Sequence, residues 1–200
     1  MKQVVAMRAI PGSGKSSLAK QILSKANAEG KTAIICSADD FFYGLGNGTY
    51  AFDRTKISDA HKYCFKKFMK AVADDIDLII IDNTNLSAWE ISPYKTYAEV
   101  HDYNFSINEV VADQKEAFRR QQHGVPDFAH ESMSNSFEKE VIPPWWEKKR
   151  ILSKTNELGN ASFEEESNDP LDTELDLKEK KASSNLFKTA CFLSEKYRLG

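Results

Sequence analysis

The sequence predicts an α/β domain with three layers and a central parallel sheet, followed by an acidic C-terminal extension. Short apolar runs rich in Ile and Val occupy Val4–Ala6, Ala33–Cys36 and Leu78–Ile81, and each run ends in polar or turn residues. Buried parallel strands have this pattern. Helical patterns separate the runs, and the alternation of strands with helices is typical of a sheet covered on both faces.

The first strand leads into a glycine-rich loop, Ala9-Ile10-Pro11-Gly12-Ser13-Gly14-Lys15-Ser16-Ser17, and then into a helical segment from Leu18. Strand, glycine loop, Gly-Lys-Ser and helix in this order are typical of a phosphate-binding P-loop. Backbone N–H groups and the helix N-terminus attract phosphate there, Lys15 can reach the β- and γ-phosphates, and the Ser16 hydroxyl can ligate magnesium. Ala9 stands where the first glycine of the motif is usual. The sequence therefore predicts a P-loop NTPase fold that binds a nucleoside triphosphate.

Further elements follow along the chain. Ala60, Cys64, Phe68 and Val72 recur at four-residue spacing and predict a helix. A fourth strand is expected in Asn104–Ala112, with one helix through Lys115–Gln122 and another after Pro126. Ligands of such sheets bind beyond the carboxyl ends of the strands.

Acidic side chains follow two of the predicted strands. Asp39 and Asp40 come after the second strand and Asp82 after the third, so we expect them to share a cleft with Ser16. A carboxylate beside a phosphate loop can hold magnesium or accept a proton from an attacking hydroxyl. The alternative is that each Asp only caps the next turn or helix. Two such sites beside a P-loop favour phosphoryl transfer to an alcohol.

Composition limits the other classes. The 200-residue chain has a net charge of −3 and a pI of about 5.9, which argues against a global attraction to nucleic acid or membrane. Its three cysteines are far apart, as expected in a reduced compartment. Neither a signal segment nor a membrane-length apolar run is seen, so we expect an intracellular protein, cytoplasmic or nuclear.

The composition turns acidic after about Arg150. We therefore expect a folded domain over 1–150 and an acidic linker with a short helix over 151–200. This C-terminal segment is a candidate contact for a protein partner.

Several strings together resemble a known family. Pro11–Ser16, Ser37–Phe42, the run Asp82-Asn83-Thr84-Asn85-Leu86-Ser87-Ala88-Trp89-Glu90, Arg119-Arg120 and His123-Gly124-Val125 resemble, in order, motifs of the Nedd-four-binding protein 2-like and phage-type polynucleotide 5′-kinases. The likeness covers about Met1 to Lys148. It implies a nucleoside/nucleotide kinase-like fold and transfer of phosphate from ATP, with Mg²⁺, to the 5′-hydroxyl of RNA or DNA.

The resemblance also implies residue roles. Asp39 would be the general base, Lys15 and Ser16 would hold the phosphates and magnesium, Asp82 would organise the acceptor or metal, and Arg120 would be the lid arginine, with Arg119 a second donor. The alternative for the arginines is a solvated basic helix face. The residues expected to contact ATP are Gly12, Ser13, Gly14, Lys15, Ser16, Ser17, Arg119 and Arg120, and those expected to contact the acceptor are Asp40, Phe42, Asp82 and Asn85.

The acceptor is the open question. The phage enzymes have an arginine where this chain has Phe42, so a phosphate contact is lost although an aromatic ring could stack on a base. Tyr43, Tyr50 and Phe52 could be further base platforms or could pack back on the domain. Lys56, Lys62, Lys66 and Lys67 could form a local basic patch, or simply a charged helix face. We interpret His123 as a capping or packing residue.

Two alternative functions remain at this stage. One is a kinase whose acceptor is a small metabolite or nucleoside, and the other is a nucleotide-dependent binding module. The sequence contains neither an Asn-Lys-x-Asp guanine-reading motif nor an Asp-x-Asp phosphatase motif, which argues against a regulatory GTPase and a 3′-phosphatase.

Overall fold

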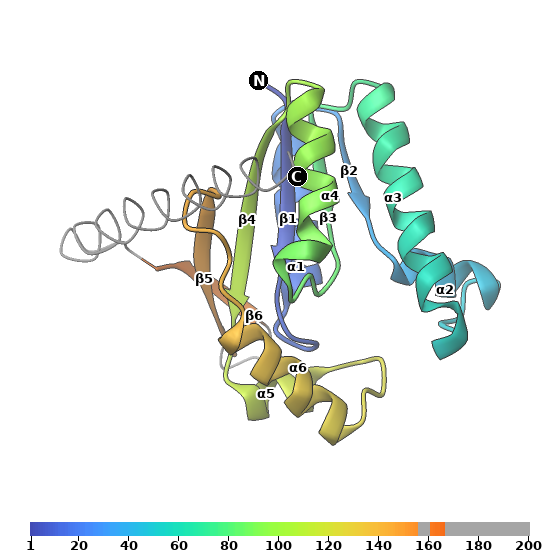
Figure 1. The fold of residues 1–200 in the computed structure, drawn as a ribbon, viewed down its shortest axis with the longest axis vertical. Helices are drawn as coiled ribbons and strands as arrows, with labels where there is room; N and C mark the ends of the chain where they lie inside the picture. The colour runs from blue at the N-terminus through green and yellow to red at the C-terminus, as the bar shows by residue number, and fades with distance from the viewer. Residues whose placement is uncertain (156–160, 167–200) are drawn as a thin grey trace, which may run out of the picture.

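A computed structural model describes residues 1–155 and 161–166. They form a six-stranded sheet with strand order β2-β3-β1-β4-β5-β6, in which β1 to β5 are parallel and β6 is antiparallel (Figure 1). The strands are β1 Gln3–Arg8, β2 Ala33–Cys36, β3 Leu78–Ile81, β4 Asn104–Val111, β5 Lys148–Thr155 and β6 Ala161–Glu165. The helices are α1 Lys15–Ala28, α2 Asp39–Leu45, the 3-10 turn η1 Arg54–Lys56, α3 Ile57–Ala73, α4 Ala88–Val100, α5 Gln114–Arg120 and α6 Asp127–Lys139.

The sheet is covered on both faces, as the apolar runs predicted. Phe68 of α3 and Tyr94 of α4 pack with Val4 and Ile79 on one face, and Leu18 of α1 packs with the alternate strand residues on the other (Figure 1). All four residues of β3 are buried, because successive side chains point to opposite faces of the sheet and helices cover both faces. The three-layer α/β prediction is confirmed.

Most predicted elements are found close to their expected bounds. The four predicted strands are present, and Ala60, Cys64, Phe68 and Val72 form the buried stripe of α3. The helices expected at 115–122 and after Pro126 are α5 and α6. Figure 1 places α5 and α6 beyond the carboxyl end of β4, at the same end of the sheet as α2. These three helices therefore surround the carboxyl ends of the strands, where a ligand is expected.

The expected domain boundary near residue 150 is wrong, because Arg150 lies inside β5 and the sheet continues through β6. Two of the acidic residues that suggested a solvated stretch, Glu164 and Glu165, lie in this edge strand, and those beyond Glu166 lie outside the described residues. Glu164 pairs with Lys154 at 2.7 Å, and Glu165 with Lys149 at 3.1 Å. Charged cross-strand pairs are common on exposed edge strands. The charged composition of β6 therefore did not indicate a strand in the sequence. The expected helix at 185–199 lies outside the described residues.

A buried ion pair joins the sheet to the helices beyond it. Arg8 at the end of β1 is 2.8 Å from Glu109 of β4, and both side chains are under 10% exposed. The Arg8 guanidinium also donates to the carbonyls of Leu86 and Phe137, at 3.0 and 2.8 Å, and lies over the Phe137 ring. One arginine thus ties β1 and β4 to α6 and to the turn that precedes α4.

None of the helices within residues 1–155 and 161–166 has the length and apolar character that a bilayer crossing requires.

Arg8→Met should lower the free energy of unfolding by about 3–5 kcal/mol, because it leaves the Glu109 carboxylate buried without its cation. Chemical denaturation followed by circular dichroism measures the change. Lys31→Met is the matched control, since it removes a pair of similar length, 2.7 Å, that is exposed to solvent, and it should leave stability nearly unchanged. Equal losses of unfolding free energy in the two variants would show that the buried Arg8–Glu109 pair contributes no more to stability than an exposed pair.

Candidate functional site

The P-loop adopts the geometry of an anion cradle between β1 and α1. Gly12 and Gly14 have φ values of 79° and 93°, in the left-handed region that favours glycine. A Cβ at Gly12 would lie 1.9 Å from the carbonyl oxygen of Ala117 in α5, so no larger residue fits there. Ser13 is fully buried, and its hydroxyl has no hydrogen-bond partner among the residues that the structure describes.

The structure brings together the predicted phosphate and metal residues. The Lys15 ammonium lies 3.0 Å from an Asp82 carboxylate oxygen and also donates to the Ser16 hydroxyl at 3.2 Å. The Lys15 and Asp82 side chains are 13% and 9% exposed, so this pair is largely shielded from water. A phosphate group entering the loop would compete with Asp82 for Lys15.

The Ser16 hydroxyl and the Asp82 carboxylate fit a magnesium ion that is bound together with a triphosphate. Both groups offer the oxygen ligands that Mg²⁺ prefers, and such ions usually take only one or two protein ligands beside phosphate and water. In the described ranges no three His, Cys, Asp or Glu side chains cluster as a metal-binding group.

Asp39 stands at the start of α2 with both carboxylate oxygens near polar groups from distant segments. The Tyr50 hydroxyl donates to Oδ1 at 2.9 Å, and Nε2 of His123 lies 3.6 Å from Oδ2. The backbone N–H of Asp39 donates to the Ser37 hydroxyl, which fixes the first turn of α2. Burial raises the pKa of Tyr50, and the charge of Asp39 raises it further, so the phenol remains a hydrogen-bond donor at neutral pH.

Sequence reasoning missed the association of Tyr50 and His123 with Asp39. Tyr50 belongs to the segment after α2, and His123 to the connection between α5 and α6. The two rings lie 4.3 Å apart, centroid to centroid. The packing role expected of His123 is compatible with this contact, but no spacing in the sequence links these residues to Asp39.

Asp40 has a different environment from Asp39. Its carboxylate accepts a 2.7 Å bond from Lys67 of α3, and Lys67 also donates to the carbonyl of Ile35. Burial lowers the pKa of Lys67, but the hydrogen bond and charge of Asp40 outweigh this effect and raise it overall. This pair fixes α2 against α3, so Asp40 is engaged in the fold rather than free for an acceptor.

Two residues expected to contact the acceptor are buried. The Phe42 side chain is 3% exposed and packs among other aromatic rings, so the expectation that it offers a stacking face is wrong. Asn85 is also 3% exposed, and its amide donates to the Met7 carbonyl at 2.7 Å. Asn85 has a φ of 47°, a conformation that asparagine tolerates better than most residues. Its role in the turn after β3 is therefore structural.

Asn83 in the same string joins the two acidic sites. Its side-chain oxygen accepts from the backbone N–H of Ala38 at 2.9 Å, and its amide nitrogen contacts the Cys64 sulfur. The Ser37 hydroxyl donates to the Asp82 carbonyl across the same gap. These bonds hold the residues after β2 and β3 together, and with them Asp39 and Asp82.

The arginines of α5 differ in exposure. Arg119 is exposed, whereas Arg120 donates weakly to the Thr155 hydroxyl at 3.4 Å. Nε and Nη2 of Arg120 are buried and have no hydrogen-bond partner among residues 1–155 and 161–166, so two strong donors are available to bind a phosphate oxygen. The α5 backbone lies directly against Gly12. His130 of α6 contacts the Pro11 carbonyl at 2.9 Å, so both helices pack on the P-loop.

The P-loop also contacts the edge strand that sequence reasoning assigned to the acidic extension. A Cβ at Gly14 would lie 3.3 Å from the Ala161 methyl and from the Phe163 ring of β6. Phe163 also packs against the core formed by α1 and β1. The loop is therefore supported from the side of β6 as well as by α5 and α6.

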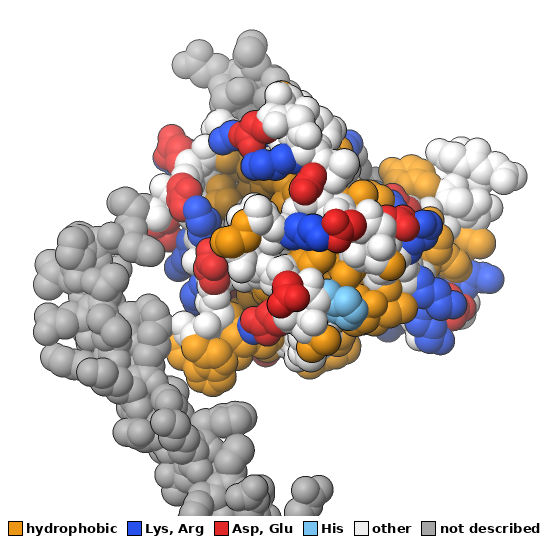
Figure 2. All heavy atoms as spheres, turned by 90° about the horizontal axis from the view of Figure 1, so that it is seen from above, with side chains coloured by type: hydrophobic (Ala, Val, Ile, Leu, Met, Phe, Trp, Pro, Cys, Tyr) orange, Lys and Arg blue, Asp and Glu red, His pale blue; other side chains and the backbone are white. Residues whose placement is uncertain are grey.

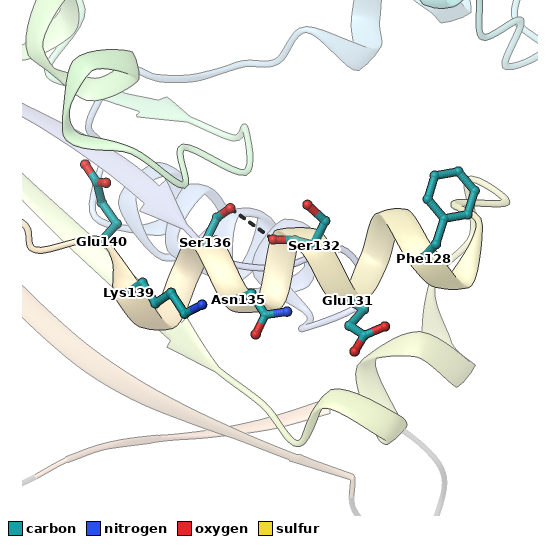
Figure 3. A pocket seen from close by; sticks show the side chains of 7 residues that line it. All are labelled: Phe128, Glu131, Ser132, Asn135, Ser136, Lys139 and Glu140. Carbon is teal, nitrogen blue, oxygen red and sulfur yellow. Dashed lines mark hydrogen bonds between the residues drawn. The ribbon is translucent and has the colours of Figure 1, made fainter.

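A pocket of about 530 Å³ lies along the outer face of α6 (Figure 3). Figure 3 shows its lining side chains on successive turns of this helix, with one hydrogen bond from the Ser136 hydroxyl to the Ser132 carbonyl. The lining residues are Phe128, Glu131, Ser132, Asn135, Ser136, Lys139 and Glu140. None of the site residues described above belongs to it.

The carboxyl ends of the strands thus bring together the P-loop backbone, a lysine, a hydroxyl, two carboxylates and an arginine with two buried donors. This set of groups can bind a triphosphate, neutralise charge on a transferred phosphoryl group and accept a proton from an attacking hydroxyl.

Known proteins resemble this chain in sequence and in fold. The chain is 35% identical over 183 residues to human NEDD4-binding protein 2, which covers 88% of the chain but only 10% of that longer protein. The fold resembles the PezAT toxin–antitoxin system of Streptococcus pneumoniae, with a TM-score of 0.58 at 11% identity over 86% of this chain and 76% of the other. It also resembles the Pnkp1/Rnl/Hen1 RNA repair complex, with a TM-score of 0.55 at 15% identity over 68% and 44%.

The match to a family model covers the region that carries the site. Residues 4–132 match the model of the AAA domain, which is more than half of the chain. This range includes the P-loop, Asp39, Asp82 and Arg120. The chain therefore belongs to the AAA domain family, as a P-loop domain of the kinase-like type.

Proposed function

We propose that this domain is an ATP- and Mg²⁺-dependent kinase that transfers the γ-phosphate to a hydroxyl group, and that the acceptor is the 5′-hydroxyl of a polynucleotide. The observation that carries the proposal is the difference between two neighbouring carboxylates. Asp82 is paired with the P-loop lysine, whereas the side-chain partners of the Asp39 carboxylate in the described part of the chain are a phenol and an imidazole. One carboxylate is thus suited to the phosphate and metal side, and the other to proton transfer.

The proposed step balances as a displacement at phosphorus. The Asp39 carboxylate accepts the proton of the acceptor hydroxyl, and that oxygen forms a bond to the γ-phosphorus while the bond to the β–γ bridging oxygen breaks and ADP leaves. Lys15 and the P-loop backbone stabilise the phosphate oxygens, and Arg120 offers its unpaired donors to the transferred group. Magnesium bound with ATP would neutralise phosphate charge, held by Ser16 and Asp82.

Two comparisons support a polynucleotide as the acceptor. The string from Asp82 to Glu90 and the motifs around it resemble the polynucleotide 5′-kinases. A structural neighbour belongs to an RNA repair complex. Because that likeness is one of fold, the choice of acceptor depends on a direct assay.

The assay is transfer of labelled phosphate from ATP to matched 5′-hydroxyl RNA and DNA oligonucleotides. Labelling of either strand would support the proposal and would rank RNA against DNA. Labelling of a nucleoside or metabolite but of no oligonucleotide would replace the acceptor. ATP binding without transfer to any hydroxyl would instead indicate a nucleotide-dependent binding module.

Asp39→Asn should reduce phosphate transfer by about 10²–10⁴-fold, because the amide cannot accept the hydroxyl proton. ATP binding, measured by calorimetry, should remain close to that of the unaltered protein. Asp40→Asn, one residue along the same helix turn, is the matched control and should keep most of the turnover, since Asp40 is bound to Lys67. Equal turnover of the Asp39 and Asp40 variants would exclude Asp39 as the base.

Asp82→Asn should raise the Mg²⁺ concentration needed for half-maximal transfer, because it removes one charged ligand of the ion. Binding of ATP without Mg²⁺ should be retained, since the substitution frees Lys15 from its carboxylate partner. A magnesium titration of turnover at fixed ATP measures the first effect. Asp102→Asn, before β4 at the opposite end of the sheet, is the control. An unchanged magnesium curve for Asp82→Asn would argue against Asp82 as a ligand.

A further inference from the structure

Aromatic rings form a continuous set of contacts that begins at Asp39. Tyr50, which donates to the Asp39 carboxylate, lies 5.2 Å from the ring of Tyr43 and 5.8 Å from that of Phe42. The buried Phe42 ring in turn supports Phe52 at 5.1 Å. Tyr43 and Phe52 therefore pack on Tyr50 and Phe42, and Tyr50 is hydrogen-bonded to Asp39, the expected general base.

The contacts extend from α2 to α3. Phe41 bridges from Phe42 to Tyr63 of α3, with centroid separations of 5.6 and 6.0 Å. The outer faces of this set are open to solvent, because Tyr43, Phe52 and Tyr63 are 42%, 55% and 43% exposed. Five of the large hydrophobic side chains that are exposed in the described part of the chain fall between residues 43 and 63. Such a concentration of exposed apolar side chains is typical of a binding surface.

Positive charge surrounds these rings although the protein is acidic overall. Between residues 54 and 66 four basic side chains, Arg54, Lys56, Lys62 and Lys66, are exposed, and Asp59 is the one acidic residue. Only Lys62 of the four has an ion-pair partner among the described residues, the exposed Asp59 at 3.5 Å. On the side of the molecule where α2 and α3 lie, Figure 2 shows Lys and Arg side chains next to hydrophobic ones.

We infer that this surface holds a single-stranded polynucleotide. We call it the aromatic–basic surface and define it as Tyr43, Phe52 and Tyr63 with Arg54, Lys56, Lys62 and Lys66. The inference rests on the proposed function and deepens it: the 5′-terminal nucleotide lies at Asp39, and the nucleotides that follow it run outward over α2 and the first half of α3.

The chemistry of the surface selects a single strand. Aromatic rings stack on the flat faces of bases, and lysines and arginines contact the phosphates between them. In a duplex the base faces are covered by neighbouring pairs, so rings on a protein surface cannot reach them. A nucleoside alone has no internucleotide phosphate for these basic residues to contact.

The experiment measures strand binding and transfer separately in the full chain. Lys62→Ala/Lys66→Ala removes two charges, and Phe52→Leu/Tyr63→Leu removes two rings while keeping apolar bulk. Binding of a fluorescent 12-nucleotide strand is followed by anisotropy at several salt concentrations without ATP. Transfer is followed with the same strand and with a nucleoside 3′-monophosphate as the short acceptor.

Each double variant should raise the KM for the strand about tenfold or more, with kcat and the KM for the short acceptor unchanged. The lysine variant should also reduce the slope of log K against log salt by about 1.4, as expected for two lost phosphate contacts on a single strand. A blunt duplex should compete poorly with the single strand. Lys20→Ala/Lys25→Ala on α1 and Trp89→Leu, a ring that is 74% exposed on α4, are the matched controls.

The outcomes separate this inference from the proposed function. If the unaltered protein phosphorylates the strand but the surface variants behave like the controls, or if duplex binds equally well, the aromatic–basic surface is wrong and the kinase proposal stands. If the surface variants lose strand binding while no strand is ever phosphorylated, the surface stands and the acceptor is wrong. Failure of the unaltered protein to bind a single strand would overturn the inference directly.

Discussion

The site depends on the register of the adjacent strands β2, β3 and β1. Cys36 of β2 and Ala6 of β1 both stand opposite Ile81 of β3, so the residues that follow these strands emerge at one edge of the sheet. A shift by one residue would exchange the side chains that pack against the helices on the two faces, so the specific packing on each face holds the register. Asn83 accepts a hydrogen bond from the backbone of Ala38, and Ser37 donates one to the Asp82 carbonyl. These bonds can form only in that register, and they set the separation of Asp39 and Asp82.

Two shielded ion pairs near this edge have opposite characters. Arg8 is satisfied by a carboxylate and two backbone carbonyls, and no group that enters the cleft can replace these partners without breaking the sheet–helix contact. The partners of Lys15 within the described ranges are Asp82 and Ser16, both beside the P-loop. The first pair supplies rigidity. The second holds the cradle together in a form that phosphate can enter by exchanging one anion for another.

Local patterns predicted the elements, but not the contacts between distant segments. The P-loop, the four parallel strands and the stripe of α3 follow from spacing and apolar character, which are properties of neighbouring residues. The approach of Tyr50 and His123 to Asp39 depends on where two irregular connections return to the sheet, and no periodicity records this. Phe42 and Asn85 were assigned by motif to the acceptor, whereas packing of the α2 aromatics and a left-handed turn bury them. In β6, charges that read as a solvated stretch are cross-strand partners of Lys149 and Lys154.

The contact of Phe163 with the P-loop changes what counts as the unit of this fold. The family match ends at residue 132, whereas β6, which packs against Gly14, lies about thirty residues later, at 161–165. A shorter gene fragment that stops at the end of the family match would lack β5 and β6 and would leave β4 as an exposed edge. The described sheet therefore continues through β6, beyond the shared family region, and β6 forms part of the wall of the P-loop.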